Sequence, residues 1–125
     1  MKKLITTILV ITGAIGLVPA AQAHATLTHS YPVANKTVTG MPTKVWLEFD
    51  DDLLQIAGKT VDVITLTDSM GMNIPTTKQY VGGARLTAEL PASKMTGRIK
   101  MSWRVVSNDG HPVSGSIYFT VKPKK

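Results

Sequence analysis

Apolar and polar residues alternate with a period of two through most of the chain after residue 24. The pattern is clearest at residues 45–50, 84–90, 99–106 and 117–122. Such alternation buries every second side chain and is typical of antiparallel strands with one exposed face. No long stretch has the 3.6-residue period of an amphipathic helix, and glycine-rich and proline-containing turns separate the segments. The pattern predicts an all-β domain, a sandwich or small barrel of six or seven strands.

The segment at residues 60–67 breaks this alternation. Its two valines share one phase, whereas Ile64 and Leu66 take the opposite phase. A β-bulge, or a strand buried on both faces, would produce such a change. We also expect a helical turn at residues 53–57 and another at residues 92–95.

The first 23 residues have the layout of a secretory signal peptide. Two lysines follow Met1, residues 4–17 are almost wholly apolar, and Ala21-Gln22-Ala23 matches a cleavage site with small residues. The apolar run is shorter than the roughly 20 residues of a transmembrane helix, which argues against the alternative of an uncleaved membrane anchor. We therefore expect export, cleavage after Ala23, and one mature domain of residues 24–125 without a membrane span.

Composition narrows the function classes further. Removal of Lys2 and Lys3 with the signal peptide lowers the basic residues from 14 to 12, against 8 acidic ones. The basic residues are scattered, except for Lys122, Lys124 and Lys125 at the end. No arginine stripe alternates with aromatic residues, so a nucleic-acid partner is not expected. Cysteine is absent. The fold therefore has no disulfide, and any metal site must use nitrogen, oxygen or thioether ligands.

Histidine is the residue type that carries candidate chemistry. The chain has 3 histidines, and the first of them, His24, follows the predicted cleavage point directly. Cleavage would leave a free α-amine on this residue, so that the amine and the imidazole Nδ1 close one chelate ring on a metal ion. Metal binding requires the amine to lose its proton, and its reference pKa of about 8 makes that possible.

A second histidine lies in the turn Asn108-Asp109-Gly110-His111-Pro112. Asp109 and His111 are two residues apart, so in extended geometry their side chains point the same way. One turn can then present a carboxylate and an imidazole together. Combined with His24, the set offers three nitrogens and one oxygen, which suit tetragonal Cu(II). Zinc also accepts such ligands, although it favours tetrahedral geometry.

Four segments that together span essentially the whole mature chain match one family pattern, at His24–Pro32, Trp46–Phe49, Trp103–Pro112 and Gly115–Phe119. The most specific features are the histidine directly after the predicted signal peptide and the block Trp-Arg-Val-Val-Ser-Asn-Asp-Gly-His. In these segments the chain resembles the periplasmic copper-resistance CopC family.

This resemblance implies an Ig-like Greek-key β-sandwich of about seven strands that binds one Cu(II) ion in the periplasm. It implies His24 (amine and imidazole), Asp109 and His111 as the ligands. The implied function is copper sequestration, copper resistance, or delivery to a CopD-like inner-membrane copper transporter or a periplasmic copper oxidase. We expect a monomer.

Many members of that family also have a methionine-rich loop, with a histidine, that binds Cu(I). The corresponding stretch, Asp68–Pro75, keeps Met70 and Met72 but lacks the histidine and the longer methionine run. Two exposed thioethers make a weak Cu(I) site unless Met41 folds nearby. The alternative, that these methionines are turn or packing residues, is favoured.

Two other functions fit parts of the same pattern. An N-terminal histidine with a second histidine also forms the histidine brace of copper monooxygenases. A carboxylate ligand such as Asp109 would occupy a coordination position and favour oxidised copper, which argues for a binding protein rather than an enzyme. The other alternative is an Ig-like adhesion domain without metal. His29 is interpreted as a surface or partner-facing residue, and the run Asp50-Asp51-Asp52 as a solvated turn rather than a calcium loop.

Overall fold

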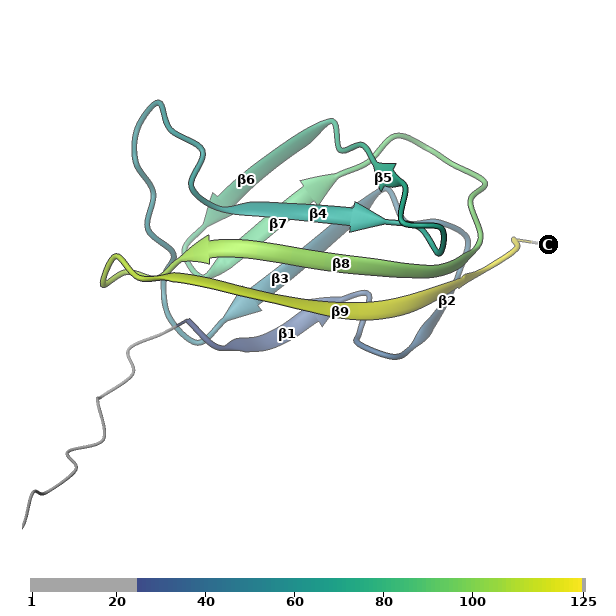
Figure 1. Cartoon of the computed structure of the whole chain (residues 1–125), viewed down its shortest axis with the longest axis horizontal. Coiled ribbons are helices and arrows are strands. Elements are labelled where there is room, and N and C mark those ends of the chain that lie inside the picture. The colour runs from purple at the N-terminus through teal and green to yellow at the C-terminus, as the bar shows by residue number, and fades with distance from the viewer. Residues whose placement is uncertain (1–24, 125) are drawn as a thin grey trace, which may run out of the picture.

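The computed structural model describes residues 25–124, which form a sandwich of two β-sheets (Figure 1). No helix long and apolar enough to cross a bilayer occurs among these residues. The four-stranded sheet contains, in spatial order, β1 (Leu27–Tyr31), β3 (Lys44–Phe49), β7 (Arg85–Glu89) and β6 (Lys78–Gly82). The five-stranded sheet contains, in spatial order, β2 (Thr37–Thr39), β9 (Pro112–Lys122), β8 (Gly97–Val106), β4 (Val63–Thr67) and β5 (Asn73–Ile74).

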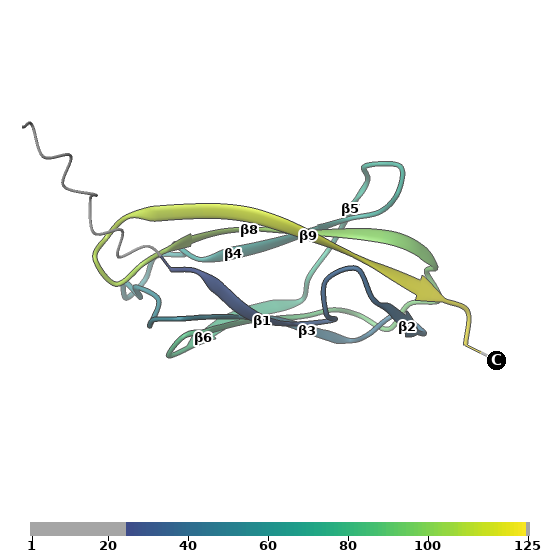
Figure 2. The ribbon, with the colours of Figure 1, turned by 90° about the horizontal axis from the view of Figure 1, so that it is seen from below.

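The two sheets face each other as separate layers (Figure 2), and the alternating apolar residues fill the space between them. This confirms the predicted all-β sandwich. The described strands exceed the expected six or seven. Strands β2 and β5, of 3 and 2 residues, are too short to show alternation, and β6 was not identified from the sequence. The fully buried core contains Val45, Leu47, Leu66, Leu86, Ala88, Ile99, Met101 and Val105.

The change of phase in the segment at residues 60–67 has a simpler cause than a bulge or a two-faced strand. Strand β4 begins only at Val63, so the valine at position 61 precedes it; within the strand Ile64 and Leu66 are buried, whereas Val63 lies half-buried on the other face. Between the two valines, Asp62 is buried and its Oδ1 accepts a hydrogen bond from the Val106 amide at 2.8 Å. Burial raises the pKa of the Asp62 carboxyl. The expected helical turns were wrong: residues 53–57 and 92–95 contain no helix.

Strands β8 and β9 form a long hairpin whose packing depends on one glycine. Trp103 of β8 is paired in register with Gly115 of β9 and contacts Phe49 of the other sheet edge-on, with ring centroids 6.2 Å apart. A Cβ atom at Gly115 would lie 2.4 Å from Cζ2 of Trp103. The indole ring therefore occupies the space of the missing side chain and fills the core toward the opposite sheet.

A glutamine side chain links the two sheets. Gln79, on β6, accepts a hydrogen bond from the Ile64 amide through Oε1 and donates one to the Ile64 carbonyl through Nε2, both at 2.8 Å. Strand β5 pairs with β4 only at Leu66 and Thr67, so it does not reach this part of the β4 edge. The carboxamide thus pairs with the backbone as a neighbouring strand would.

Replacement of this glutamine should destabilise the domain. Gln79→Leu keeps an apolar stem but leaves the Ile64 amide and carbonyl unpaired, so we expect the free energy of unfolding to fall by about 2 kcal/mol or more. Urea denaturation followed by circular dichroism measures the loss. Gln55→Leu makes the same chemical change at an exposed side chain and should alter stability by less than about 0.5 kcal/mol. Equal effects at the two positions would contradict this role.

Candidate metal centre

The turn between β8 and β9 is held in one conformation by its own hydrogen bonds. The Gly110 amide donates to the Ser107 carbonyl at 2.8 Å, and the Ser107 amide donates to the His111 carbonyl at 2.9 Å. Gly110 has a φ of 88°, in the left-handed region that favours glycine. The sequence Asn-Asp-Gly-His therefore forms a tight turn that presents Asp109 and His111 at one end of the sandwich.

Asp109 and His111 lie in direct contact in this turn. Oδ2 of Asp109 is 2.9 Å from Nδ1 of His111, and the His111 amide donates to Oδ1 at 3.2 Å. The His111 side chain is 64% exposed and that of Asp109 31% exposed, so an ion in solution can reach both. The structure thus brings together the two donors that their spacing placed in one turn.

Hydrogen bonds stabilise the ionised form of this carboxylate. The Ser107 hydroxyl, and after it His111, hold the pKa of the Asp109 carboxyl well below its usual range. Because this pKa is lower in the folded than in the unfolded chain, the ionised group stabilises the fold above the unfolded-state pKa, and that contribution is lost as the pH falls. At neutral pH Asp109 is therefore an anionic oxygen donor, which fits a divalent cation.

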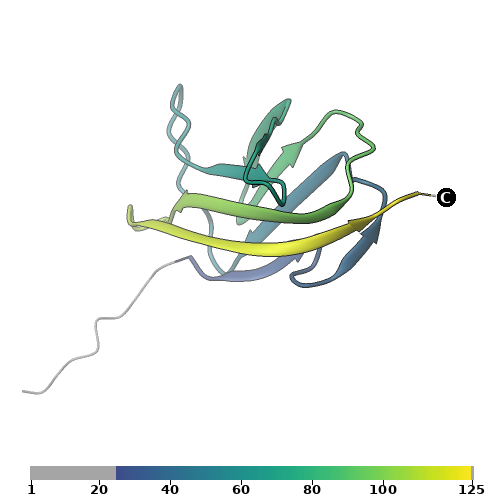
Figure 3. The same ribbon diagram turned by 45° about the vertical axis from the view of Figure 1, so that its right-hand side comes forward.

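The start of the described chain is anchored at the same end of the sandwich. The Thr26 amide donates to Oδ1 of Asp50 at 2.8 Å, and the Asp50 amide donates to the Thr26 carbonyl at 2.9 Å. Three residues further on, Leu53 forms a β-bridge with Ser107, at the base of the turn that carries the candidate ligands. Figures 1 and 3 show the beginning of β1 and the β8–β9 turn at one end. His24 itself lies outside the described residues.

Asp50 is the residue near this end that sequence reasoning missed. The run of three aspartates was interpreted as a solvated turn, yet Asp50 makes a reciprocal pair of hydrogen bonds with a residue 24 positions earlier. No local pattern signals such a contact, because its partner, Thr26, lies far away in the sequence, just before β1. Asp51, in contrast, accepts a local hydrogen bond from the amide of Asp52.

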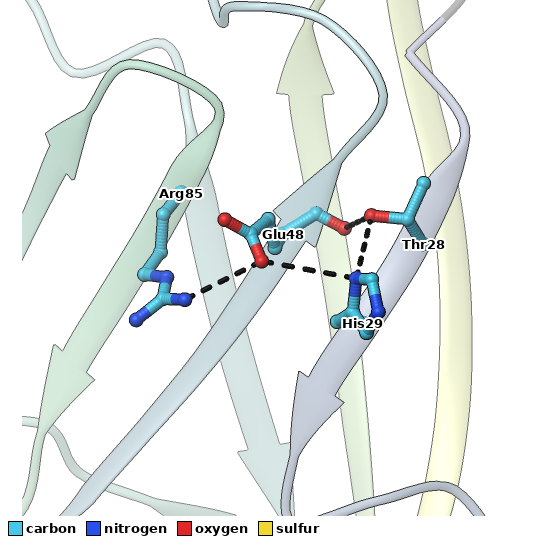
Figure 4. A network of polar contacts seen from close by, with 4 residues as sticks. All are labelled: Thr28, His29, Glu48 and Arg85. Carbon is cyan, nitrogen blue, oxygen red and sulfur yellow. Dashed lines mark hydrogen bonds and ion pairs between the residues drawn. The ribbon is translucent and has the colours of Figure 1, made fainter.

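His29 belongs to a different cluster, on the outer face of the four-stranded sheet (Figure 4). Its Nδ1 lies 3.2 Å from the Thr28 hydroxyl and 3.8 Å from Oε2 of Glu48, which also pairs with Arg85 at 3.3 Å. Its side chain is 72% exposed, as expected for a surface residue. Within residues 25–124 no three His, Asp or Glu side chains come together in a group able to hold a metal ion.

The methionines of the stretch Asp68–Pro75 lie on the turn between β4 and β5. Met70 and Met72 are 86% and 64% exposed, and both of their amides donate to Oδ1 of Asp68 at 2.9 Å. Met41, which might have completed a thioether site, is instead buried and lines a cavity together with Met95. The structure thus gives Met70 and Met72 the environment of turn residues.

Comparisons with known proteins agree with the fold. The family model of the CopC domain matches residues 27–122. Copper resistance protein C of Xanthomonas campestris pv. juglandis is 35% identical over 130 residues, covering 97% of each chain. The crystal structure of CopC from Methylosinus trichosporium OB3b superposes with a TM-score of 0.69 at 30% identity, covering 82% of this chain and 97% of that one.

A second solved structure has the same fold. The crystal structure of PcoC, a methionine-rich copper resistance protein from Escherichia coli, gives a TM-score of 0.65 at 29% identity and covers 79% of this chain and 99% of that one. The matched range includes both strands of the β8–β9 hairpin and the turn with Asp109 and His111. The chain therefore belongs to the CopC family.

Proposed function

We propose that this protein is an exported copper-binding protein that holds one Cu(II) ion between His24, Asp109 and His111 and acts in copper resistance. The observation that carries the proposal is the contact between Asp109 and His111 at the end of the sandwich where Thr26 is anchored. Because His24 is joined to this anchored segment through Ala25, its amine and imidazole have only a short reach from that end.

The donor set accounts for the choice of metal. The amine and Nδ1 of His24, the imidazole of His111 and the carboxylate of Asp109 give three nitrogens and one oxygen, a set that suits tetragonal Cu(II). The low pKa of Asp109 keeps its oxygen ionised, so no proton has to leave this group when copper binds. The hydrogen bond between Asp109 and Nδ1 of His111 also orients the imidazole ring before the ion arrives.

The same donors favour binding over catalysis. A copper monooxygenase needs an open coordination position and cycling between Cu(I) and Cu(II), whereas an anionic oxygen at the metal fills a position and stabilises the oxidised ion. The metal-free adhesion domain is the weaker alternative, because it gives no reason for an exposed aspartate and histidine in contact. Membership of a family whose relatives are named copper resistance proteins supports the binding role.

The cellular compartment and the partner protein follow from this proposal. Signal-peptide cleavage after Ala23 creates the amine ligand, so the site forms only in the exported, periplasmic protein. An exposed site at one end of a monomer is accessible to a receiver, such as a CopD-like membrane transporter or a periplasmic copper oxidase. Sequestration of copper needs no receiving protein. Both sequestration and delivery would serve copper resistance. A Cu(I) role for Met70 and Met72 is not part of the proposal.

A copper titration of the processed protein tests this function. We expect His111→Ala to weaken Cu(II) binding at least about 100-fold, because it removes a ligand rather than a hydrogen-bonding neighbour, whose loss alone costs about 10–100-fold. His29→Ala is the matched control and should leave the affinity unchanged, since His29 belongs to the Glu48 cluster. If the two variants bind copper alike, or if wild-type protein binds none, the proposed site is wrong.

A further inference from the structure

A cavity of about 620 Å³ lies at the opposite end of the sandwich from the β8–β9 turn. Three chain segments enclose it: Gly40–Thr43 between β2 and β3, residues 92–96 between β7 and β8, and Lys122–Lys124 at the end of β9. Figures 1 and 2 show these segments meeting at the end where the C-terminus lies. Its volume falls within the range of about 300–1,000 Å³ that is usual for small-molecule sites.

Part of the cavity wall is apolar and belongs to the margin of the core. Met41 is only 9% exposed, and Met95 is half-buried and packs against the core cluster. Ala92 and Pro123 extend the apolar wall. An apolar group of a ligand would therefore leave water on entering, which favours binding.

The remainder of the wall carries positive charge. Lys94, Lys122 and Lys124 line the cavity and are exposed, and none of them forms an ion pair with a residue in the described range 25–124. No Asp or Glu of that range lines the cavity. The nearby Lys44 differs, because it pairs with Glu89 at 3.8 Å. Three ammonium groups without an ion-pair partner among the described residues, beside an apolar wall, create a positive potential that attracts anions.

We propose that this cavity binds an amphipathic anion, a phosphate or carboxylate carried on a short apolar chain. The apolar chain packs against Met41 and Met95, and the head group lies among Lys94, Lys122 and Lys124. A bare anion would leave the apolar wall in water, and a neutral apolar molecule would make no use of the lysines. The site shares no residue with the proposed copper ligands, so it stands independently of the copper function.

Octyl phosphate, used as a monomer below its micelle concentration, is a suitable probe. We expect saturable binding by copper-free protein, with shifts of the Met41 and Met95 methyl resonances in NMR and weakening as salt is added. The double variant Lys94→Gln with Lys124→Gln should reduce the affinity about tenfold or more, because each lysine near an anionic group contributes about 1 kcal/mol. Lys36→Gln with Lys59→Gln removes the same charge outside the cavity and should leave binding within about twofold of the wild type.

Two results would overturn this proposal. Binding of 1-octanol as tight as that of octyl phosphate would show that the lysines do not select an anion. Equal weakening in the two double variants would show attraction by net charge rather than a site. Vesicles distinguish the sources of the ligand: binding to phosphatidylglycerol but not phosphatidylcholine vesicles supports a lipid head group, whereas binding of monomeric octyl phosphate alone supports a free amphiphile.

Discussion

A single glycine added ahead of His24 is expected to weaken Cu(II) binding by the mature chain at least about 100-fold. The added residue converts the α-amine of His24 into a peptide nitrogen and opens the chelate ring that the amine forms with the imidazole. That loss should exceed the roughly 10–100-fold effect of removing a group that merely orients a ligand. Competition with a chromophoric chelator measures the affinity, and EPR spectra report the number of nitrogen ligands.

The matched control carries the same glycine after Lys125. The two extended chains have identical composition and mass, and mass spectrometry of N-terminal fragments confirms which of them begins with His24. We expect the C-terminally extended chain to bind copper like the unmodified mature protein. Equal affinity of the two extended chains would place the copper site away from the N-terminus and remove the reason for a histidine at the predicted cleavage point.

Gly115→Ala should lower the free energy of unfolding by about 2–3 kcal/mol, the upper part of the usual range for overpacking. The new methyl group would lie 2.4 Å from Cζ2 and 2.8 Å from Cε2 of Trp103. The indole cannot move aside cheaply, because it packs against the core and contacts Phe49. Urea denaturation measures the change, and in a domain of this size each 1 kcal/mol shifts the melting temperature by roughly 4–8 °C.

Gly82→Ala provides the comparison, because a Cβ atom there meets nothing within 4 Å. Its effect should stay within about 0.5 kcal/mol. If the clash with the indole is the cause, Trp103→Phe should lower the free energy of unfolding less in the Gly115→Ala protein than in the wild type. The difference between the two losses, which is the coupling energy of the double-mutant cycle, should be at least about 0.5 kcal/mol. Additive effects of the two substitutions would assign the loss to the backbone of β9 instead.

The strands that sequence reasoning found are those whose alternation is long enough to show a phase. Residues 99–106 and 117–122 alternate over most of β8 and β9, and one buried face follows from that pattern alone. Strand β2 has only 3 residues and pairs in parallel with β9. Such a strand exists because a distant neighbour offers hydrogen bonds, so its own residues carry little signal.

In the candidate site, too, contacts within one turn could be predicted from the sequence, whereas contacts between distant segments could not. The proximity of Asp109 and His111 could be predicted because both belong to one turn, where spacing determines geometry. The anchoring of Thr26 by Asp50 could not, because that contact forms only when β1 and the end of β3 meet. The location of Met41 likewise depended on the path of its loop, which brings it to Met95 rather than into the methionine turn.

The carboxamide of Gln79 has a consequence for solubility. Backbone amides and carbonyls left open along a strand edge are a template on which another chain can add a strand, the first step of aggregation. At the beginning of β4 the Ile64 groups are occupied by a side chain from the other sheet, so this edge offers no such template. A protein without cysteine has no disulfide to keep its sheets together during transient opening, and a covered edge lowers the risk that two opened molecules pair.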